Sequence, residues 1–516
     1  MHLRRTLTAG SALAVAMALL SAPAAGSAAP TATTGAASST INWQTCADTA
    51  FAKWPVFPQV KQYFQCATLV RPLDRTKPKG AKVTLALIKL PASGTPDQRK
   101  GVLLWNPGGP GQSGVELSSV SFLLPEAVRQ SFDFITWDPR GIGVSTPAIK
   151  GPGCEIPKPT RPATGTVDWS KVLKERMPQV RRMNARCFER NAAIIENAGT
   201  LDNAYDIEAI RQALGEQQIN YWGLSYGTLL GSTYLQLFPE RVRAAVLDSN
   251  MDPQMNLHDM VESAVAPDHS LGFFLDANPE TADQYYSVIA SLDRKSLKLP
   301  NGDVYTRWDV LDVLNDSVMF YTDPSGDWSV AEQVISTAYA AIFGTGVAQQ
   351  SALKALESPD LQSPSSGTVG SLWSAVVCQD FADRLSPAEQ RSQLAWAVRN
   401  GPFYGGTLGM DMVTTCDGYD KAKPHPVPRP KAYGPNVPVM VAASTRDGET
   451  PYQWSVNMAR VYRNSRMVTL VGGLHGTFGL AQSECVNTAL GDFLISGQLP
   501  AVDLSCPWTP PAPPPT

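Results

Sequence analysis

A serine in a turn between two glycines is the residue of this sequence whose position most clearly suggests chemistry. Residues 220–231 read NYWGLSYGTLLG, with apolar residues before Ser225 and small and apolar residues at helical spacing after it. Strand, sharp turn and helix form a nucleophile elbow, in which Gly223 and Gly227 leave room for the neighbouring strand and helix. We therefore predict that Ser225 is a nucleophile. The N–H of the next residue, Tyr226, would then point to the place where a substrate carbonyl becomes an oxyanion.

An acid and a histidine follow later in the chain, each after a short apolar run typical of a strand. Asp447 stands in STRDGETP and His475 in GGLHG. A serine hydroxyl is a poor nucleophile until a histidine accepts its proton, and an ionised acid fixes the imidazole tautomer. We predict that Ser225, Asp447 and His475 form a catalytic triad, with Glu449 as the rival acid.

Two glycine-containing loops also follow strands. The first, NPGGPG at residues 106–111, suits backbone N–H groups that bind an oxyanion, and Gly109 is the donor we expect from it, with a plain tight turn as the alternative. A phosphate-binding loop is disfavoured because no Lys-Ser or Lys-Thr follows. The second, DPRGIGVS from Asp138, places Arg140 where the two side chains could pair and brace the site.

These loops require a sheet that presents them at one edge, and the pattern predicts such a sheet. A helix should precede the elbow, with Asp202 or Asn203 as its N-cap and Gly215 as its end. Residues 254–436 change to helical segments rich in aromatics, which we interpret as a lid inserted into an interrupted α/β domain. Apolar runs predict strands at 83–90, 102–105, 132–137, 221–224, 244–247, 437–443 and 467–471.

Composition narrows the class of partner. The chain has 516 residues, 43% of them hydrophobic, and a net charge of −3, so it can bury a large core. It has no basic stripe and no charged tail, which disfavours nucleic acid as a partner. Partners are therefore expected in a pocket, and we expect a monomer.

The N-terminus predicts export. Arg4 and Arg5 precede an apolar run at residues 12–20 and then small residues, the pattern of a signal peptide over residues 1–29. The run is too short to span a bilayer, so we expect a secreted protein without stable membrane association. Residues 30–40 are expected to be a linker or propeptide, 41–253 and 437–506 the two parts of the core, and 507–516 a proline-rich tail.

Eight cysteines in an exported chain suggest four disulfides, although 105 connectivities are formally possible. Pairing in sequence order closes four modest loops and is the arrangement that we expect. The chain has no C-x-x-C and its five histidines stand apart, so we expect no metal and no cofactor. The expected pairs are Cys46 with Cys66, Cys154 with Cys187, Cys378 with Cys416 and Cys485 with Cys506.

Together these motifs resemble the secreted tripeptidyl aminopeptidases, relatives of proline iminopeptidases within the α/β-hydrolase superfamily. The resemblance covers most of the mature chain and rests on NPGGPGQSG, DPRGIGVS, YWGLSYGTLLG, the Asp447 and His475 loops and a Cys-x-Asp at Cys378. It implies an α/β-hydrolase fold with a mainly parallel central sheet and a large helical lid. It also implies release of short peptides, typically tripeptides, from free N-termini. This sequence departs from the family pattern at Val377 and at residues 416–419. Both positions lie in the expected lid, so they bear on the length of substrate and the substrate preference.

We predict that an acidic residue of the lid, Asp380, binds the free N-terminal amine of a peptide substrate. A cationic amine that enters a covered pocket needs an anionic partner, and Asp380 is tethered beside Cys378. Two other roles for Asp380 remain open, because it could cap a helix or pair with Arg384.

Two rival functions also remain. The same triad cleaves esters, so a secreted esterase or lipase is possible, and a hydrolase fold can serve as a catalytically silent binding protein. Dehalogenase and epoxide hydrolase chemistry is disfavoured because those enzymes place an acid where Ser225 stands. The sequence leaves open the number of residues released, any preference for proline, propeptide processing and the physiological substrate.

Overall fold

The computed structural model describes residues 41–46, 61–151, 154, 161–319, 328–361, 370–430, 436–481 and 483–508. The expected signal peptide at 1–29, the linker at 30–40 and all but the first two residues of the tail lie outside the described residues.

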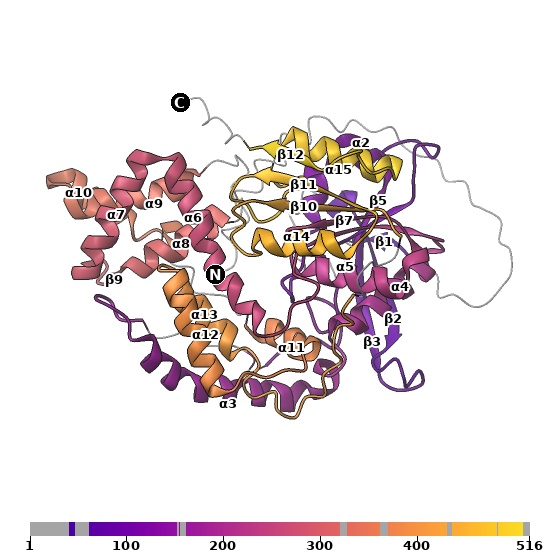
Figure 1. Cartoon of the computed structure of the whole chain (residues 1–516), viewed down its shortest axis with the longest axis horizontal. Coiled ribbons are helices and arrows are strands. Elements are labelled where there is room, and N and C mark those ends of the chain that lie inside the picture. Colours follow the sequence, from indigo (N-terminus) through magenta and orange to yellow (C-terminus); the bar gives the residue numbers. More distant parts are fainter. Residues whose placement is uncertain are drawn as a thin grey trace.

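Within the described residues a ten-stranded sheet carries the fold, in the order β1-β2-β3-β5-β4-β6-β7-β10-β11-β12 (Figure 1). The pairs from β5–β4 to β11–β12 are parallel, and the three pairs at the β1 end are antiparallel. The predicted mainly parallel sheet is therefore confirmed, and β1, β2 and β12 are additional to the predicted strands. The strands are β1 Gln44–Thr45, β2 Gln65–Pro72, β3 Lys82–Leu90, β4 Val102–Asn106, β5 Asp133–Asp138, β6 Ile219–Leu224, β7 Val242–Asp248, β10 Val439–Ser444, β11 Ser465–Val471 and β12 Leu504–Pro507.

The central strands are buried on both faces, which explains why they are continuous apolar runs rather than alternating ones. In β6, Tyr221 packs in the core on one face and Trp222 in the core on the other. The first core contains side chains from α4 (Thr200–Leu214), α5 (Tyr226–Leu237) and α14 (Tyr452–Val461). The second contains side chains from α2 (Glu126–Ser131) and α15 (Glu484–Ser496).

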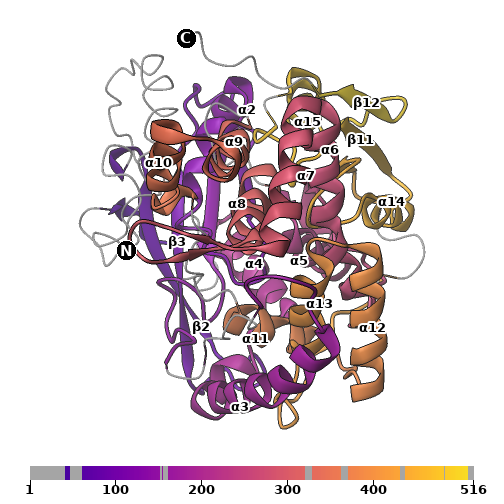
Figure 2. The same cartoon turned by 90° about the vertical axis from the view of Figure 1, so that its left-hand side faces the viewer.

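Between β7 and β10, which are neighbours in the sheet, the chain runs through a long, mostly helical segment. We call residues 249–438 the inserted segment; it contains the stretch that we interpret as a lid. It forms most of the helical layer on the left and lower side of Figure 1, which faces the viewer in Figure 2. Its elements are α6 Ala266–Ala277, α7 Pro279–Arg294, β8 Leu297–Lys298, β9 Val304–Tyr305, α8 Arg307–Met319, α9 Ser329–Phe343, α10 Gly346–Ala355, α11 Gly370–Asp380, α12 Pro387–Asn400 and α13 Gly405–Thr414.

One long helix from the first half of the chain joins this layer. α3 (Trp169–Ile195) precedes the elbow in sequence but packs against α11, α12 and α13. In both views it lies along the lower edge of the molecule, beneath these helices (Figures 1 and 2). The helical layer therefore includes residues outside the stretch that we interpret as a lid.

Four disulfides join the eight cysteines in sequence order, as predicted: Cys46–Cys66, Cys154–Cys187, Cys378–Cys416 and Cys485–Cys506. Cys378–Cys416 ties the end of α11 to the chain just after α13, so it fixes α11 within the helical layer.

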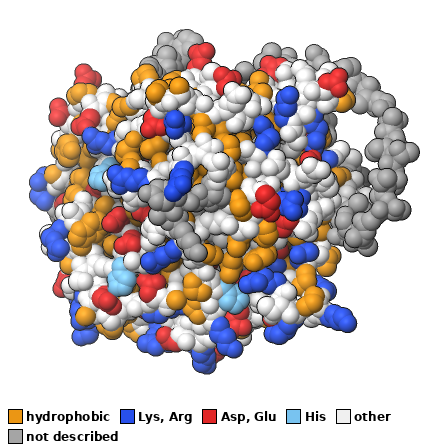
Figure 3. All heavy atoms as spheres, turned by 45° about the vertical axis from the view of Figure 1, so that its right-hand side comes forward, with side chains coloured by type: hydrophobic (Ala, Val, Ile, Leu, Met, Phe, Trp, Pro, Cys, Tyr) orange, Lys and Arg blue, Asp and Glu red, His pale blue; other side chains and the backbone are white. Residues whose placement is uncertain are grey.

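The surface carries charge of both signs. On the face shown in Figure 3, the Lys and Arg side chains are interspersed with Asp and Glu and form no single-sign stripe. None of the helices in the described part of the chain combines the length and the apolar character needed to cross a membrane.

Candidate active site

Ser225 lies at the junction of β6 and α5 in a strained backbone conformation. Its φ of 57° and ψ of −127° are unusual for a residue with a side chain. The turn is possible because its flanking glycines are in tight contact. A side-chain carbon at Gly223 would lie 2.4 Å from the carbonyl oxygen of Gly227, and one at Gly227 would lie 2.5 Å from that of Asn106. The structure therefore contains the strand, turn and helix that the sequence predicted, with Ser225 at the strand end.

His475 and Asp447 meet at the same edge of the sheet. Nδ1 of His475 lies 2.9 Å from Oδ1 of Asp447, and both side chains are buried. Oδ1 of Asp447 also accepts hydrogen bonds from the backbone N–H groups of Glu449 and Thr450, each at 2.8 Å. These bonds fix the carboxylate towards the imidazole. The structure thus places Asp447 in hydrogen-bond contact with His475 and Glu449 close beside the pair.

The end of β7 joins the His475 loop to the nucleophile strand, a role that was not predicted from the sequence. The Ser225 N–H donates to the carbonyl oxygen of Asp248 at 3.0 Å. The Asp248 carboxylate accepts from the N–H groups of Thr477 and Phe478 and from the Thr477 hydroxyl, at 2.9 to 3.1 Å. The Gly476 N–H donates to Oγ of Ser249 at 2.8 Å. An acid at the end of a buried strand, VLD before Ser249, was the only signal for this role.

The charges around His475 determine how readily it accepts a proton. Burial lowers the pKa of His475, but the charge and hydrogen bond of Asp447 raise it, with further contributions from Glu449 and Asp248. The net result is a pKa above the ordinary value of 6.5. Burial also raises the pKa of Glu449 to about 7. His475 is therefore a stronger base than a free imidazole, which suits proton transfer from a serine hydroxyl.

The glycine loop after β4 lies against the elbow. A side-chain carbon at Gly108 would lie 2.8 Å from the backbone nitrogen of Tyr226 and 3.0 Å from Cβ of Ser225. Gly108 has a φ of 90° and Gly109 a φ of 104°, conformations that favour glycine. The structure therefore brings the segment with Gly109 next to Tyr226, the two oxyanion donors that we predict.

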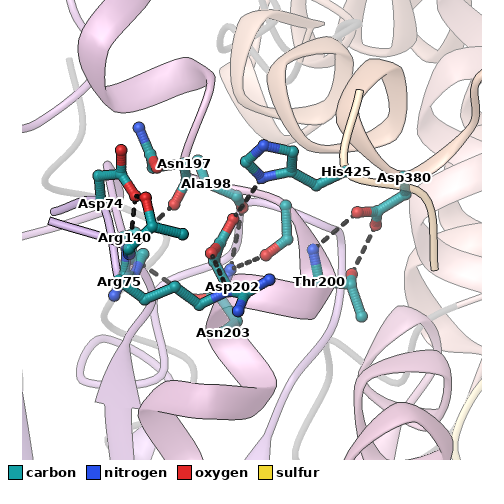
Figure 4. Close-up of polar contacts among 12 residues, drawn as sticks. Asp74, Arg75, Arg140, Asn197, Ala198, Thr200, Asp202, Asn203, Asp380 and His425 are labelled. Atoms are coloured by element: carbon teal, nitrogen blue, oxygen red, sulfur yellow. Dashed lines mark hydrogen bonds and ion pairs between the residues drawn. The ribbon is translucent and has the colours of Figure 1, made fainter. Parts of the chain in front are cut away.

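Asp380 lies at the end of α11 and is almost fully buried, with 2% of its surface exposed. Its carboxylate accepts hydrogen bonds from the N–H of Thr200 at 2.7 Å and from its hydroxyl at 2.5 Å (Figure 4). It also accepts one from the Tyr226 hydroxyl at 2.6 Å. Thr200 is the first residue of α4, so Asp380 caps that helix from a distant part of the chain. The structure thus shows the helix-capping role that the sequence left open for Asp380, whereas Arg384 donates to backbone carbonyls instead.

The N-cap predicted for α4 was wrong, because the cap residue is Gly199. Asp202 instead lies inside the first turn, 3.0 Å from Nδ1 of His425 and 3.5 Å from Nε of Arg75 (Figure 4). Asn203 donates to the carbonyl oxygens of residues 198 and 199. The predicted C-terminal Gly215 is confirmed, with a φ of 74°.

The predicted pairing of Asp138 with Arg140 was also wrong. Asp138 accepts from the Ser113 hydroxyl at 2.5 Å and from backbone N–H groups on both flanking loops. Arg140 forms a buried ion pair with Asp206 on α4, with one contact at 2.8 Å. Each charge has a different partner because the loop turns between them, and both still brace the strand ends.

Within the described residues, no group of three or more His, Cys, Asp or Glu side chains is arranged to hold a metal ion.

A sequence model of the alpha/beta hydrolase fold matches residues 101–480. This chain belongs to the α/β-hydrolase family. The match spans the elbow, the inserted segment and both the Asp447 and His475 loops.

Curated relatives extend over most of the chain. The chain is 29% identical to a tripeptidyl aminopeptidase of Streptomyces lividans, covering 91% of this chain and 87% of that protein. It is 29% identical to the serine protease Hip1 of Mycobacterium tuberculosis, covering 86% of this chain and 87% of that protein. It is 30% identical to carboxylesterase B of the same organism, covering 86% of both chains. These relatives confirm the resemblance to tripeptidyl aminopeptidases, and the protein is a serine hydrolase.

Proposed function

We propose that this protein is an exported serine exopeptidase that releases short peptides, typically tripeptides, from the free N-termini of peptides and proteins. The proposal requires no cofactor. The observation that carries it is the Asp447–His475 pair, held beside the nucleophile elbow by Asp248, in a chain whose relatives include tripeptidyl aminopeptidases.

The proposed reaction has two halves, acylation of Ser225 and hydrolysis of the acyl-enzyme, and the same protein groups act in both. Oγ of Ser225 attacks the scissile carbonyl carbon while Nε2 of His475 accepts the hydroxyl proton. Asp447 holds the imidazole and stabilises the imidazolium, and the N–H groups of Gly109 and Tyr226 stabilise the oxyanion. His475 then protonates the leaving amine, which leaves an acyl-enzyme. Water, activated by the same imidazole, releases the peptide acid and restores Ser225.

Export is supported by two independent features of the chain. The first 29 residues have the charge and apolar pattern of a signal peptide. All eight cysteines form disulfides, which persist in oxidising compartments such as the extracellular space. Expression of the full chain, followed by N-terminal sequencing of protein from the culture medium, tests this part. Protein that stays in the cytoplasm with its N-terminus intact contradicts it.

A carboxylesterase is the second candidate, and the similarity to carboxylesterase B favours it. The triad and oxyanion donors do not report the leaving group, so esters and amides must be compared directly. A catalytically silent binding protein is the third. A fluorophosphonate probe separates it, because only an activated serine is labelled, and Ser225→Ala is the control.

The decisive experiment is digestion of a mixed peptide library, with free and acetylated N-termini, followed by mass spectrometry. The proposal predicts short N-terminal fragments of one main length from free peptides and little cleavage of acetylated ones. Equal cleavage of both sets indicates an endopeptidase. Ester hydrolysis without peptide cleavage indicates the carboxylesterase.

A further inference from the structure

We propose that Asp380 is a positioning residue for catalysis, which acts by fixing the oxyanion-donating backbone of Tyr226 through a hydrogen bond to the Tyr226 side chain. The proposal rests on the serine-hydrolase function above and applies to ester and peptide substrates alike. This role differs from recognition of the substrate's amine, because here Asp380 contacts Tyr226 of the enzyme and not the substrate.

Tyr226 is held at both ends. Its backbone nitrogen follows Ser225 and faces Gly108, where no side-chain carbon fits because it would lie 2.8 Å away. Its ring is buried, with its centroid 6.2 Å from that of Trp373 in an edge-on arrangement, and its hydroxyl donates to Asp380 at 2.6 Å. A tyrosine has only two side-chain torsions, so fixing the ring and the hydroxyl also restrains the backbone that carries the N–H.

Asp380 is itself fixed by three further constraints. It receives two hydrogen bonds from Thr200, at the N-terminus of α4, where a helix favours negative charge. Its own carbonyl oxygen accepts from the Val427 N–H at 3.1 Å. The disulfide between Cys378 and Cys416 lies two residues before it. The acceptor for the Tyr226 hydroxyl is therefore a rigid point of the fold.

The same helix also contacts the other half of the oxyanion site. A side-chain carbon at Gly111 would lie 2.7 Å from Cβ of Leu372, so the end of the glycine loop packs directly on α11. α11 thus holds the glycine loop through Leu372 and the elbow through Trp373 and Asp380. Such preorganisation matters because a catalytic constellation must be held within about 0.5 Å of its productive geometry.

A carboxylate suits this position better than a neutral acceptor. Hydrogen bonds to an ionised group are shorter and about twice as strong as neutral ones, and the three here span 2.5 to 2.7 Å. Burial works against the charge and raises the pKa of Asp380 to about 7. The three hydrogen bonds offset part of that penalty.

The test compares two variants with a matched control in the mature, disulfide-intact enzyme. Tyr226→Phe removes the hydroxyl, and Asp380→Asn removes the charge. Tyr462→Phe is the control, because the Tyr462 hydroxyl is also buried and also bonded to α5, to Ser232 at 2.8 Å. The control should lose stability as Tyr226→Phe does but keep its kcat.

Kinetic constants and inhibitor binding identify the step affected. We expect kcat to fall about tenfold in Tyr226→Phe, the factor that corresponds to one modest hydrogen bond, with KM within twofold. A tripeptide aldehyde forms a hemiacetal with Ser225 whose oxygen needs the oxyanion donors, so its Ki should rise by the same factor. The Ki of the tripeptide acid, which lacks that oxyanion, should not change.

Two results would overturn the proposal. In the first, Tyr226→Phe and Asp380→Asn lose only melting temperature, with kcat and the aldehyde Ki unchanged, and Asp380 is then a helix cap alone. In the second, Asp380→Asn raises KM for free peptides and leaves acetylated peptides unaffected, and Asp380 then reads the amine. A wild type that neither hydrolyses substrate nor takes the fluorophosphonate label contradicts the proposed function itself, which distinguishes the two failures. If Asp380→Asn does not fold, Tyr226→Phe alone decides the question.

Discussion

Replacing Asp248 by Asn should impair catalysis and also shift its pH dependence, because Asp248 joins the nucleophile strand to the His475 loop. The carboxylate accepts three donors on Thr477 and Phe478, and its side chain is fully buried. The amide of the Asn variant keeps one of the two carboxylate oxygens. It replaces the second oxygen by an NH₂ group, which then faces the N–H or O–H donors that the second oxygen accepted from. The variant thus loses at least one hydrogen bond to a charged group and leaves its NH₂ group facing another donor. We expect this change to destabilise the fold by about 2 to 3 kcal/mol.

The kinetic effect follows from the loop's position. His475 is two residues before Thr477, so release of the loop displaces the imidazole. A misplacement of about 1 Å lowers kcat/KM by about a hundredfold. In addition, Asp248 raises the pKa of His475, so removing its charge should move the acid limb of the kcat/KM profile to lower pH.

The assay is kcat/KM for a tripeptide anilide from pH 5 to 9, together with thermal melting. Asp268→Asn is the matched control: Asp268 also accepts two backbone N–H groups, from Phe403 and Tyr404, but lies in the inserted segment. It should lose stability without a shift of the acid limb. The reasoning about Asp248 fails if its Asn variant melts lower yet keeps the wild-type kcat/KM and the wild-type acid limb.

Three further predictions follow from other parts of the structure. The pKa of His475 is raised above 6.5 and only the neutral imidazole accepts a proton, so wild-type activity should be half lost on acidification at a pH above 6.5; a flat profile down to about pH 5 in folded protein contradicts this. Gly227→Ala should destabilise the protein by about 1 to 3 kcal/mol and abolish activity, because the new carbon meets the Asn106 carbonyl, whereas Gly272→Ala, with open space around it, should do neither. Removing the Cys378–Cys416 disulfide with paired alanines should cost about 2 to 5 kcal/mol in chemical denaturation, and an unchanged midpoint contradicts the structural role given to it.

Local chemistry made the elbow and the strand ends predictable from the sequence. Gly223, Ser225 and Gly227 lie within five residues, and their roles depend on backbone contacts that almost any α/β arrangement requires. The seven predicted strands were recognisable because strands buried on both faces are continuous apolar runs, whereas β1, β2 and β12, at or next to the edges of the sheet, were not predicted. Gly215 was predictable from local conformation alone, because a left-handed residue at the C-terminal end of a helix strongly favours glycine.

Partners that are distant in the sequence were not predictable. Asp202 is a normal N-cap residue by local pattern, but the N-terminus of α4 is capped by Asp380, 180 residues away. Asp138 and Arg140 are near each other in sequence, yet buried carboxylates and guanidinium groups pair with whatever donors or acceptors the fold supplies, here Ser113 and Asp206. The sequence around Asp248 contains no motif that would distinguish a residue linking Ser225 to the His475 loop from an ordinary residue at a strand end.

The packing of α3 could not be read from the sequence for a similar reason. No helix was predicted over residues 169–195, and an apolar helix face does not by itself identify the elements that it packs against. In the structure it lies with α11, α12 and α13 instead. The helical layer around the site therefore combines a segment before the elbow with the segment inserted after β7.

Mass spectrometry of a free-amine peptide library, digested by the wild type and by Ser225→Ala, tests directly whether Ser225 cleaves peptides from their free N-termini. We expect short N-terminal fragments of one main length from the wild type and none from Ser225→Ala at an unchanged melting temperature. Cleavage by a folded Ser225→Ala variant, or cleavage at internal bonds irrespective of the N-terminus, would contradict it.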